Sequence, residues 1–136
     1  MIEQTLGLIK PDVVATGKTG DIIKIIEENG FIIDRMEKGI LKKEHAEIFY
    51  DIHKEKPFFN ELVEFITSGP LIVLALRKEN AVEEWRNLMG ATDPQKAADG
   101  TIRKIFGTTI GNNAVHGSDS IENAKKELML FFGEQH

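Results

Sequence analysis

The chain has 136 residues, a length that suits one domain with a core large enough to fold alone. Its composition, 41% apolar and 29% charged, is that of a globular protein, and no window approaches the roughly 18 consecutive apolar residues that a membrane span needs. The net charge of −5 excludes a general attraction to nucleic acid or anionic membranes, and the lack of cysteine excludes disulfides, zinc–thiolate sites and thiol catalysis.

The N-terminal half alternates between strand-like and helical patterns. Thr19 is a candidate N-cap for a helix that carries Ile22, Ile25 and Ile26 on one face, with Gly30 as its stop. The N-terminus itself lacks the basic region and cleavage site of a secretory signal, so we expect a cytoplasmic protein. The strands expected in this half are 4–9 and 31–41, and the expected helices are 20–29, 42–54 and 58–67.

The C-terminal half begins with the aliphatic run LIVLAL at 71–76, which is typical of a strand buried on both faces. A helix follows over 79–88, and residues 90–112 then show no sustained periodicity. A loop of about twenty residues inside a compact domain indicates either a functional element or disorder. Residues 114–116 predict a short strand that ends at His116, and 120–131 predict the last helix.

This order of elements predicts an α+β fold. The economical arrangement is a ferredoxin-like sandwich, in which helices pack on one face of a four-stranded antiparallel sheet. The sequence contains no internal repeat, low-complexity tract or linker, so residues 1–136 are expected to form a single domain.

One phosphate-binding motif is present only in part. Residues 16–19, Thr-Gly-Lys-Thr, match the end of the P-loop pattern, but the glycine required five positions before Gly17 is replaced by Asp12. A carboxylate there would lie where anionic phosphate binds. A capped helix start explains these residues better.

His116 differs from the other histidines in its context. His45 and His53 lie on a charged predicted helix and His136 is terminal, so we expect all three at the surface. His116 ends an apolar run and is followed by Gly-Ser-Asp-Ser, a sequence typical of a helix cap. It is either a histidine satisfied by backbone groups at a turn or a nucleophile aimed at an anion pocket.

A nucleophilic imidazole needs one nitrogen free and the other held by an acceptor that fixes its tautomer. Glu127, in the following helix, is the candidate acceptor, although its position equally suits a solvated carboxylate. Phe58 and Phe59 provide either a stacking platform or a hydrophobic staple. Candidate phosphate ligands, each more often a surface residue when taken alone, are Lys10, Arg86, Thr92 and Arg103.

Six stretches, in this order and at these separations, resemble nucleoside diphosphate kinases from end to end: TLGLIKPDVV, KPFF, SGP, ATDP, GTIRKIFG and NNAVHGSDS. The last is a highly specific motif. The resemblance implies a ferredoxin-like fold and magnesium-dependent transfer of the terminal phosphoryl group between nucleoside tri- and diphosphates. It also implies a ping-pong cycle through a phosphohistidine, with broad base specificity because stacking reads no base edge.

Position by position, the resemblance implies the following roles. His116 is the nucleophile, Glu127 holds its other ring nitrogen, and Ser118 lies nearby. Lys10 contacts the transferring phosphate and the ribose hydroxyl, and Tyr50 buttresses the site. The implied nucleotide ligands are Arg86, Thr92 and Arg103 for the phosphates, Asn113 for the ribose 3′ hydroxyl, and Phe58 and Ile110 for the two faces of the base.

The resemblance also implies a homo-oligomer, with a hexamer favoured over a tetramer. Residues 90–112 match the family's subunit-contact loop. Magnesium is expected to be carried mainly by the nucleotide phosphates. Asp99 replaces a proline found in many relatives, and the chain ends soon after Phe132, as in shorter bacterial-type members. Two other classes stay open: a non-catalytic nucleotide-binding or scaffold protein, and a nucleic-acid-binding protein, which the net charge disfavours.

Overall fold

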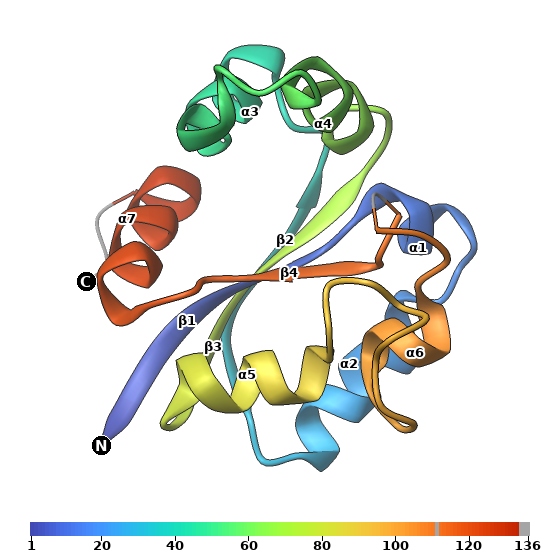
Figure 1. Ribbon diagram of the computed structural model, residues 1–136. Coiled ribbons are helices and arrows are strands. Elements are labelled where there is room, and N and C mark those ends of the chain that lie inside the picture. Colours follow the sequence, from blue (N-terminus) through green and yellow to red (C-terminus); the bar gives the residue numbers. More distant parts are fainter. Residues whose placement is uncertain (111, 134–136) are drawn as a thin grey trace.

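A computed structural model of the chain describes residues 1–110 and 112–133 (Figure 1). These residues form a four-stranded sheet in the order β2-β3-β1-β4, in which every neighbouring pair is antiparallel. The α+β sandwich expected from the sequence is therefore confirmed. The strands are β1 (Ile2–Ile9), β2 (Ile32–Gly39), β3 (Leu71–Glu79) and β4 (Val115–Gly117).

Helices cover both faces of the sheet, whereas the sequence led us to expect them on one face (Figure 1). On one side lie α1 (Pro11–Ala15), α2 (Thr19–Glu28), α5 (Ala81–Met89) and α6 (Ile102–Phe106). On the other side lie α3 (Lys43–Phe49), α4 (Phe59–Ile66) and α7 (Ile121–Phe132). None of the helices described is both long and apolar enough to cross a bilayer.

Two apolar clusters, one on each face, explain this arrangement. Successive side chains of a strand point to opposite faces, so a continuous apolar strand feeds two cores. In β3, Leu74 and Leu76 pack in the cluster with α2 and α5, whereas Val73 and Ala75 pack in the cluster with α3, α4 and α7. The run LIVLAL thus has the two-sided burial that its composition predicted.

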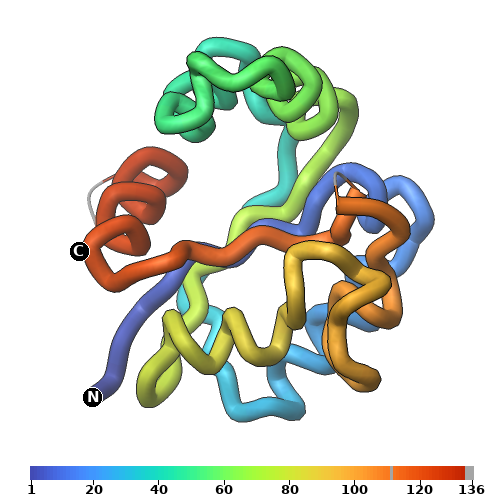
Figure 2. The backbone as a smooth tube through the Cα atoms, viewed as in Figure 1, coloured from blue at the N-terminus to red at the C-terminus, as the bar shows by residue number. Residues whose placement is uncertain are grey.

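Two local expectations were wrong, and one helix was not predicted. Thr19 is the first residue of α2 rather than its cap, and Lys18 occupies the cap position. The segment 90–112 contains α6, and the turn after β1 contains α1. Each of these helices has five residues, which is too short to establish a helical period in the sequence. Figure 2 shows the segment after α5 looping beside α6 before the chain returns as β4.

The turns before and after β4 set the position of His116. Ala114 has φ 77°, and the Val115 N–H donates to the Asn113 carbonyl at 2.9 Å, which closes a γ-turn. The chain then pairs with β1, where His116 lies opposite Leu8. The Ser120 hydroxyl accepts from the Asn123 N–H at 3.0 Å and caps α7, as the Gly-Ser-Asp-Ser sequence predicted.

Candidate functional site

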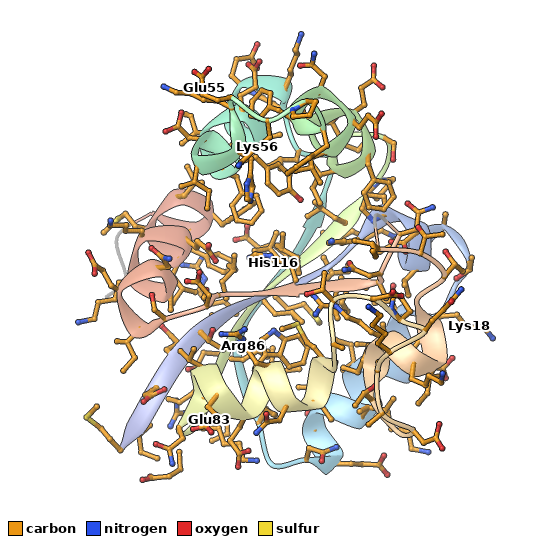
Figure 3. All side chains as sticks on the ribbon, in the orientation of Figure 1. Lys18, Glu55, Lys56, Glu83, Arg86 and His116 are labelled. Carbon is orange, nitrogen blue, oxygen red and sulfur yellow. The ribbon has the colours of Figure 1, made fainter. Side chains whose placement is uncertain are left out.

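His116 projects from β4 toward the face of the sheet that carries α3 and α7 (Figure 3). Its side chain is 24% exposed and borders a hollow of about 200 Å³. Tyr50, His53 and Glu127 line the same hollow. The imidazole is therefore reachable from solvent while most of its surface is packed.

Glu127 fixes the orientation of this imidazole. The Nε2 of His116 lies 3.2 Å from Glu127 Oε1, and the Ser118 hydroxyl donates to the same oxygen at 2.7 Å. Ser118 is itself buried. A carboxylate only accepts, so the ring donates from Nε2 and its Nδ1 keeps a lone pair. The sequence-based pairing of His116 with Glu127, and the place given to Ser118, correspond to this geometry.

Burial lowers the pKa of His116 below its usual 6.5. The hydrogen bond and charge of Glu127 oppose this shift, while the charges of Lys10 and Arg103 add to it. The ring is therefore neutral at neutral pH. A neutral imidazole with a free Nδ1 lone pair is a nucleophile.

Phe49 and Tyr50 form the aromatic side of the hollow. The Phe49 ring meets the His116 ring edge-on, with 4.8 Å between the ring centroids. Tyr50 is buried, and burial together with the charge of Glu127 raises its pKa to about 12, so it remains a neutral phenol. Tyr50 was predicted from the sequence as a site residue, whereas Phe49 was not. The only indication of Phe49 in the sequence was its helical spacing from Ala46 and its position next to Tyr50, which place it with them on the inner face of the helix.

Two histidines expected at the surface are half-buried. The ring of His45 stacks on Phe131 with 5.4 Å between centroids, and its Nε2 lies 2.8 Å from the Leu130 carbonyl. His45 therefore ties α3 to α7. His53 lines the His116 hollow, and its ring centroid lies 5.6 Å from that of Phe58. His136, also expected at the surface, lies outside the described residues.

Lys10 is linked to the loop after α5 through Asn113. Its side chain is buried, and Nζ donates to Asn113 Oδ1 at 2.7 Å. The Asn113 Nδ2 in turn donates to the Thr92 carbonyl at 3.0 Å. Burial, and then the charge of Arg103, lower the pKa of Lys10 to about 8. The structure thus connects three residues that are far apart in the sequence.

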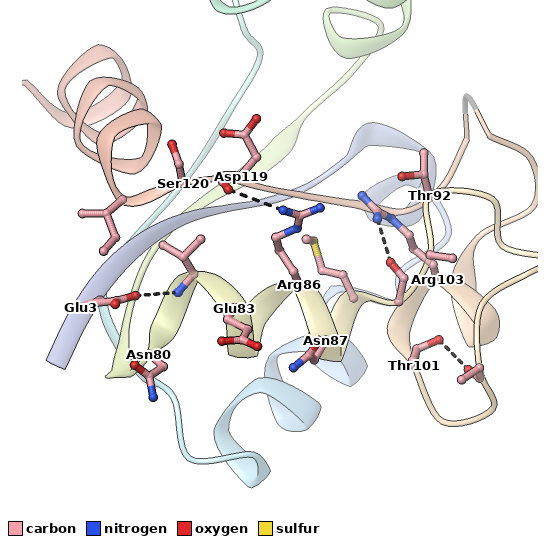
Figure 4. A pocket seen from close by; sticks show the side chains of 16 residues that line it. Glu3, Asn80, Glu83, Arg86, Asn87, Thr92, Thr101, Arg103, Asp119 and Ser120 are labelled. Atoms are coloured by element: carbon pink, nitrogen blue, oxygen red, sulfur yellow. Dashed lines mark hydrogen bonds between the residues drawn. The ribbon is translucent and has the colours of Figure 1, made fainter. Parts of the chain in front are cut away.

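A second hollow, of about 680 Å³, is lined by the other candidate phosphate ligands (Figure 4). Arg86, Thr92 and Arg103 all line it. The Arg86 guanidinium approaches the Asp119 carbonyl at 3.5 Å. Because Asp119 lines this hollow and also the one at His116, the two hollows adjoin.

Arg103 is held in a fixed orientation. Its two terminal nitrogens donate to the carbonyls of Gly90 and Val115, each at 3.0 Å. Burial, followed by the charge of Arg86, lowers the pKa of Arg103 to about 10, so the guanidinium remains charged at neutral pH. Its Nε is buried and has no hydrogen-bond partner within the described residues. Arg103 therefore places positive charge next to β4 and braces the backbone there.

The two candidate base contacts lie further out. Phe58 is 43% exposed, whereas its neighbour Phe59 is half-buried against the core formed with α3, α4 and α7. Only one ring of the Phe-Phe pair therefore faces solvent. Ile110 is 62% exposed. His53 links Phe58 to the His116 hollow, and no described contact joins Phe58 to Ile110.

Known proteins resemble this chain along almost its whole length. Residues 3–136 match the family described as nucleoside diphosphate kinase. The nucleoside diphosphate kinase of Nitratiruptor sp. is 54% identical over 134 residues, which cover 98% of this chain and 98% of that protein.

Solved structures agree. The nucleoside diphosphate kinase of Aquifex aeolicus superposes with a TM-score of 0.94 at 40% identity, covering 97% of this chain and 96% of that one. The halophilic enzyme of Halobacterium salinarum, solved in complex with CDP, also gives a TM-score of 0.94 at 40% identity, with 98% and 90% covered.

Proposed function

The chain belongs to the nucleoside diphosphate kinase family, enzymes that transfer the terminal phosphoryl group of a nucleoside triphosphate to a nucleoside diphosphate through a histidine intermediate, and we propose that His116 carries that group here. The observation that carries this assignment is the hydrogen bond from His116 Nε2 to Glu127, because it leaves Nδ1 free in a solvent-accessible hollow.

In the first half-reaction, Nδ1 of His116 attacks the terminal phosphorus. A phosphorus–nitrogen bond forms, and the bond to the bridging oxygen breaks, so the nucleoside diphosphate leaves with that oxygen. Glu127 stabilises the positive charge that develops on the ring because it accepts the Nε2 proton's hydrogen bond. In the second half-reaction, a terminal oxygen of the acceptor diphosphate attacks the phosphorus of the phosphohistidine. A phosphorus–oxygen bond forms, and the phosphorus–nitrogen bond breaks with its electron pair returning to Nδ1, which restores the neutral ring.

We propose that the negative charge of the nucleotide phosphates is neutralised by Lys10, Arg86 and Arg103. Phosphoryl transfer requires mainly positioning and electrostatic stabilisation from the protein. These three cations lie in or beside the adjoining hollows. This local positive charge supports the assignment, even though the net charge of the whole chain is −5. Thr92 completes the phosphate contacts in this proposal, and Ser118 and Tyr50 hold Glu127 and the hollow in place.

For the nucleoside, we assign the ribose 3′ hydroxyl to Asn113 and the base to Phe58, with Ile110 opposite. The exposed ring of Phe58 supports this because stacking on one aromatic face accepts any base. The Asn113 side-chain oxygen already accepts a hydrogen bond from Lys10, so a ribose hydroxyl bound there would contact both residues.

Members of this class generally use a divalent metal, and we propose Mg²⁺ bound to the nucleotide phosphates. Within residues 1–110 and 112–133, no group of three metal-ligating side chains is placed to hold an ion. Mg²⁺ commonly binds through substrate phosphates and keeps several waters. When bound, it would neutralise charge on the transferring group. Chelation by EDTA should stop transfer, and added Mg²⁺ should restore it.

The family forms oligomers, and we propose a hexamer in preference to a tetramer, with residues 1–136 acting as one domain in each subunit. Light scattering of the purified protein measures the subunit number directly. A cytoplasmic location is part of the same proposal, because a chain without cysteine needs no oxidising compartment.

Steady-state kinetics with ATP and dTDP test the proposed cycle. A covalent intermediate gives parallel lines in double-reciprocal plots at several fixed concentrations of the second substrate. Converging lines would indicate direct transfer in a ternary complex, and would remove His116 from its proposed role.

A further inference from the structure

We propose that Trp85 is a positioning residue for His116: its indole N–H and its ring hold the backbone from which the imidazole projects. This inference rests on the function proposed above for His116. Trp85 is the chain's only tryptophan, it lies in α5, and it is fully buried. Its Nε1 donates a hydrogen bond to the His116 carbonyl at 3.1 Å.

The indole packs directly against the backbone at Gly117. A Cβ added at Gly117 would lie 2.4 Å from Trp85 Cδ1 and 2.5 Å from Nε1, distances that side-chain carbons do not adopt. The ring therefore occupies the space where any other residue would have its side chain. His116 is thus held by the indole at its own carbonyl and at the residue that follows it.

The same ring also contacts β1. Gly7 is the register partner of Gly117, and a Cβ added at Gly7 would lie 3.3 Å from Trp85 Cζ2. The indole therefore lies across a pair of facing glycines, one on each strand. Phe31 also meets its ring edge-on, with 5.9 Å between the ring centroids.

Trp85 and the His116 side chain lie on opposite faces of the sheet. Trp85 belongs to the apolar cluster formed with α2 and α5, whereas the His116 ring contacts Phe49 and Glu127 from α3 and α7. The imidazole is thereby fixed at both ends: Glu127 holds the ring, and Trp85 holds the main chain. β4 needs such support because it has three residues and pairs with β1 on one side only among the described strands.

Trp85 lines neither hollow, so we expect its replacement to slow phosphoryl transfer and to leave nucleotide binding unchanged.

Two variants separate the effect of the Trp85 hydrogen bond from the effect of its packing. Trp85→Phe removes the N–H and part of the ring. Benzothienylalanine incorporated at position 85 keeps the indole shape and replaces the N–H with sulfur. Ile26→Val, in the same apolar cluster, is the matched control for a small loss of packing.

The measurement is the single-turnover rate of phosphohistidine formation from γ-labelled ATP, together with the KM for ATP and dTDP. We expect both position-85 variants to form the intermediate about three- to tenfold more slowly, the factor that one hydrogen bond supplies, with KM unchanged and Ile26→Val at the wild-type rate. Wild-type rates in both variants would overturn the inference.

A slow Trp85→Phe with a normal benzothienylalanine protein would overturn the role given to the indole N–H, because the packing of the ring alone would then hold the backbone. If Trp85→Phe does not fold, the benzothienylalanine protein decides the question by itself. The wild-type protein separates the two proposals. If it forms no phosphohistidine, the assignment of His116 fails, whereas equal rates in wild type and variants reject only the role of Trp85.

Discussion

Glu127 accepts two hydrogen bonds at a single oxygen, one from His116 Nε2 at 3.2 Å and one from Ser118 at 2.7 Å. The carboxylate thereby selects the tautomer of the imidazole and is itself held in place from a second side. The ring nitrogen that could form a bond to phosphorus is determined by the residue that binds the other nitrogen.

Replacement of Glu127 tests this relationship. We expect Glu127→Gln to lower the transfer rate about tenfold or more, because a hydrogen bond to a charged group is worth about 1.5–3 kcal/mol. Ser118→Ala should have a smaller effect, since Ser118 acts through Glu127. Glu122→Gln, an exposed change on the same helix, is the control for steady-state rate measurements. Equal rates in Glu127→Gln and Glu122→Gln would contradict this account.

The pH profile should have an alkaline limb set by Lys10. Burial and the charge of Arg103 lower the pKa of Lys10 to about 8, so its ammonium is lost as the pH rises through about 8. We expect kcat/KM, which reports ionisation of the free enzyme, to fall there. Lys10→Arg should abolish this limb because a guanidinium stays charged, whereas the exposed change Lys18→Arg should retain it. An unchanged limb in Lys10→Arg would exclude Lys10 as its origin.

Stability should respond to the same ionisation in the opposite direction. The folded pKa of Lys10 lies below the usual 10.5, so the unfolded chain binds more protons between about pH 8 and that value. The contribution of Lys10 to the free energy of unfolding therefore rises with pH across this window while activity falls. Urea denaturation of wild type and Lys10→Met measures the difference. A wild-type free energy of unfolding that falls with rising pH relative to that of Lys10→Met would be inconsistent with a buried, desolvated ammonium.

The adjacent rings of Phe58 and Phe59 should separate binding from folding. Phe58 is 43% exposed, and we expect Phe58→Ala to raise the KM for purine and pyrimidine nucleotides alike by about tenfold, since base stacking is worth about 1–3 kcal/mol. Phe59→Ala should instead lower the melting temperature, because its ring packs against the core. The reverse pattern would remove Phe58 from the nucleotide site.

Arg103 should matter for both rate and stability. Its two terminal nitrogens hold the carbonyls of Gly90 and Val115. We expect Arg103→Lys to lower the transfer rate about tenfold or more and also the melting temperature, since an ammonium cannot reproduce two charge-assisted bonds of fixed geometry. Lys104→Ala, an exposed change on the same short helix, provides the control. A wild-type rate in Arg103→Lys would show that charge alone suffices there.

The strongly patterned parts of the fold could be predicted from the sequence. The run LIVLAL is buried on both faces, and Ser120 caps the last helix, because these features depend on local composition. The five-residue helices after Lys10 and Thr101 could not be predicted, since they contain little more than one turn each. The second layer of helices was missed for a similar reason: periodicity shows that a helix has an apolar face, but not which side of the sheet it covers.

The candidate site, like the fold, contains residues that could be predicted from the sequence and residues that could not. The side chains named from the sequence are those whose chemistry is recognisable, such as His116, Glu127 and Arg103. Phe49 and Trp85 were not recognised as neighbours of His116 because apolar rings on amphipathic helices look like ordinary core residues. Their contacts with His116 depend on how α3 and α5 pack against β4, which no local pattern encodes.

The most direct test of the central claim is covalent labelling. Wild-type protein incubated with Mg²⁺ and γ-labelled ATP should acquire acid-labile, base-stable label that passes to any added nucleoside diphosphate. His116→Ala should acquire none, whereas His53→Ala, which alters another ring in the same hollow, should still be labelled. Label retained by His116→Ala, or absent from the wild type, would contradict the role assigned to His116.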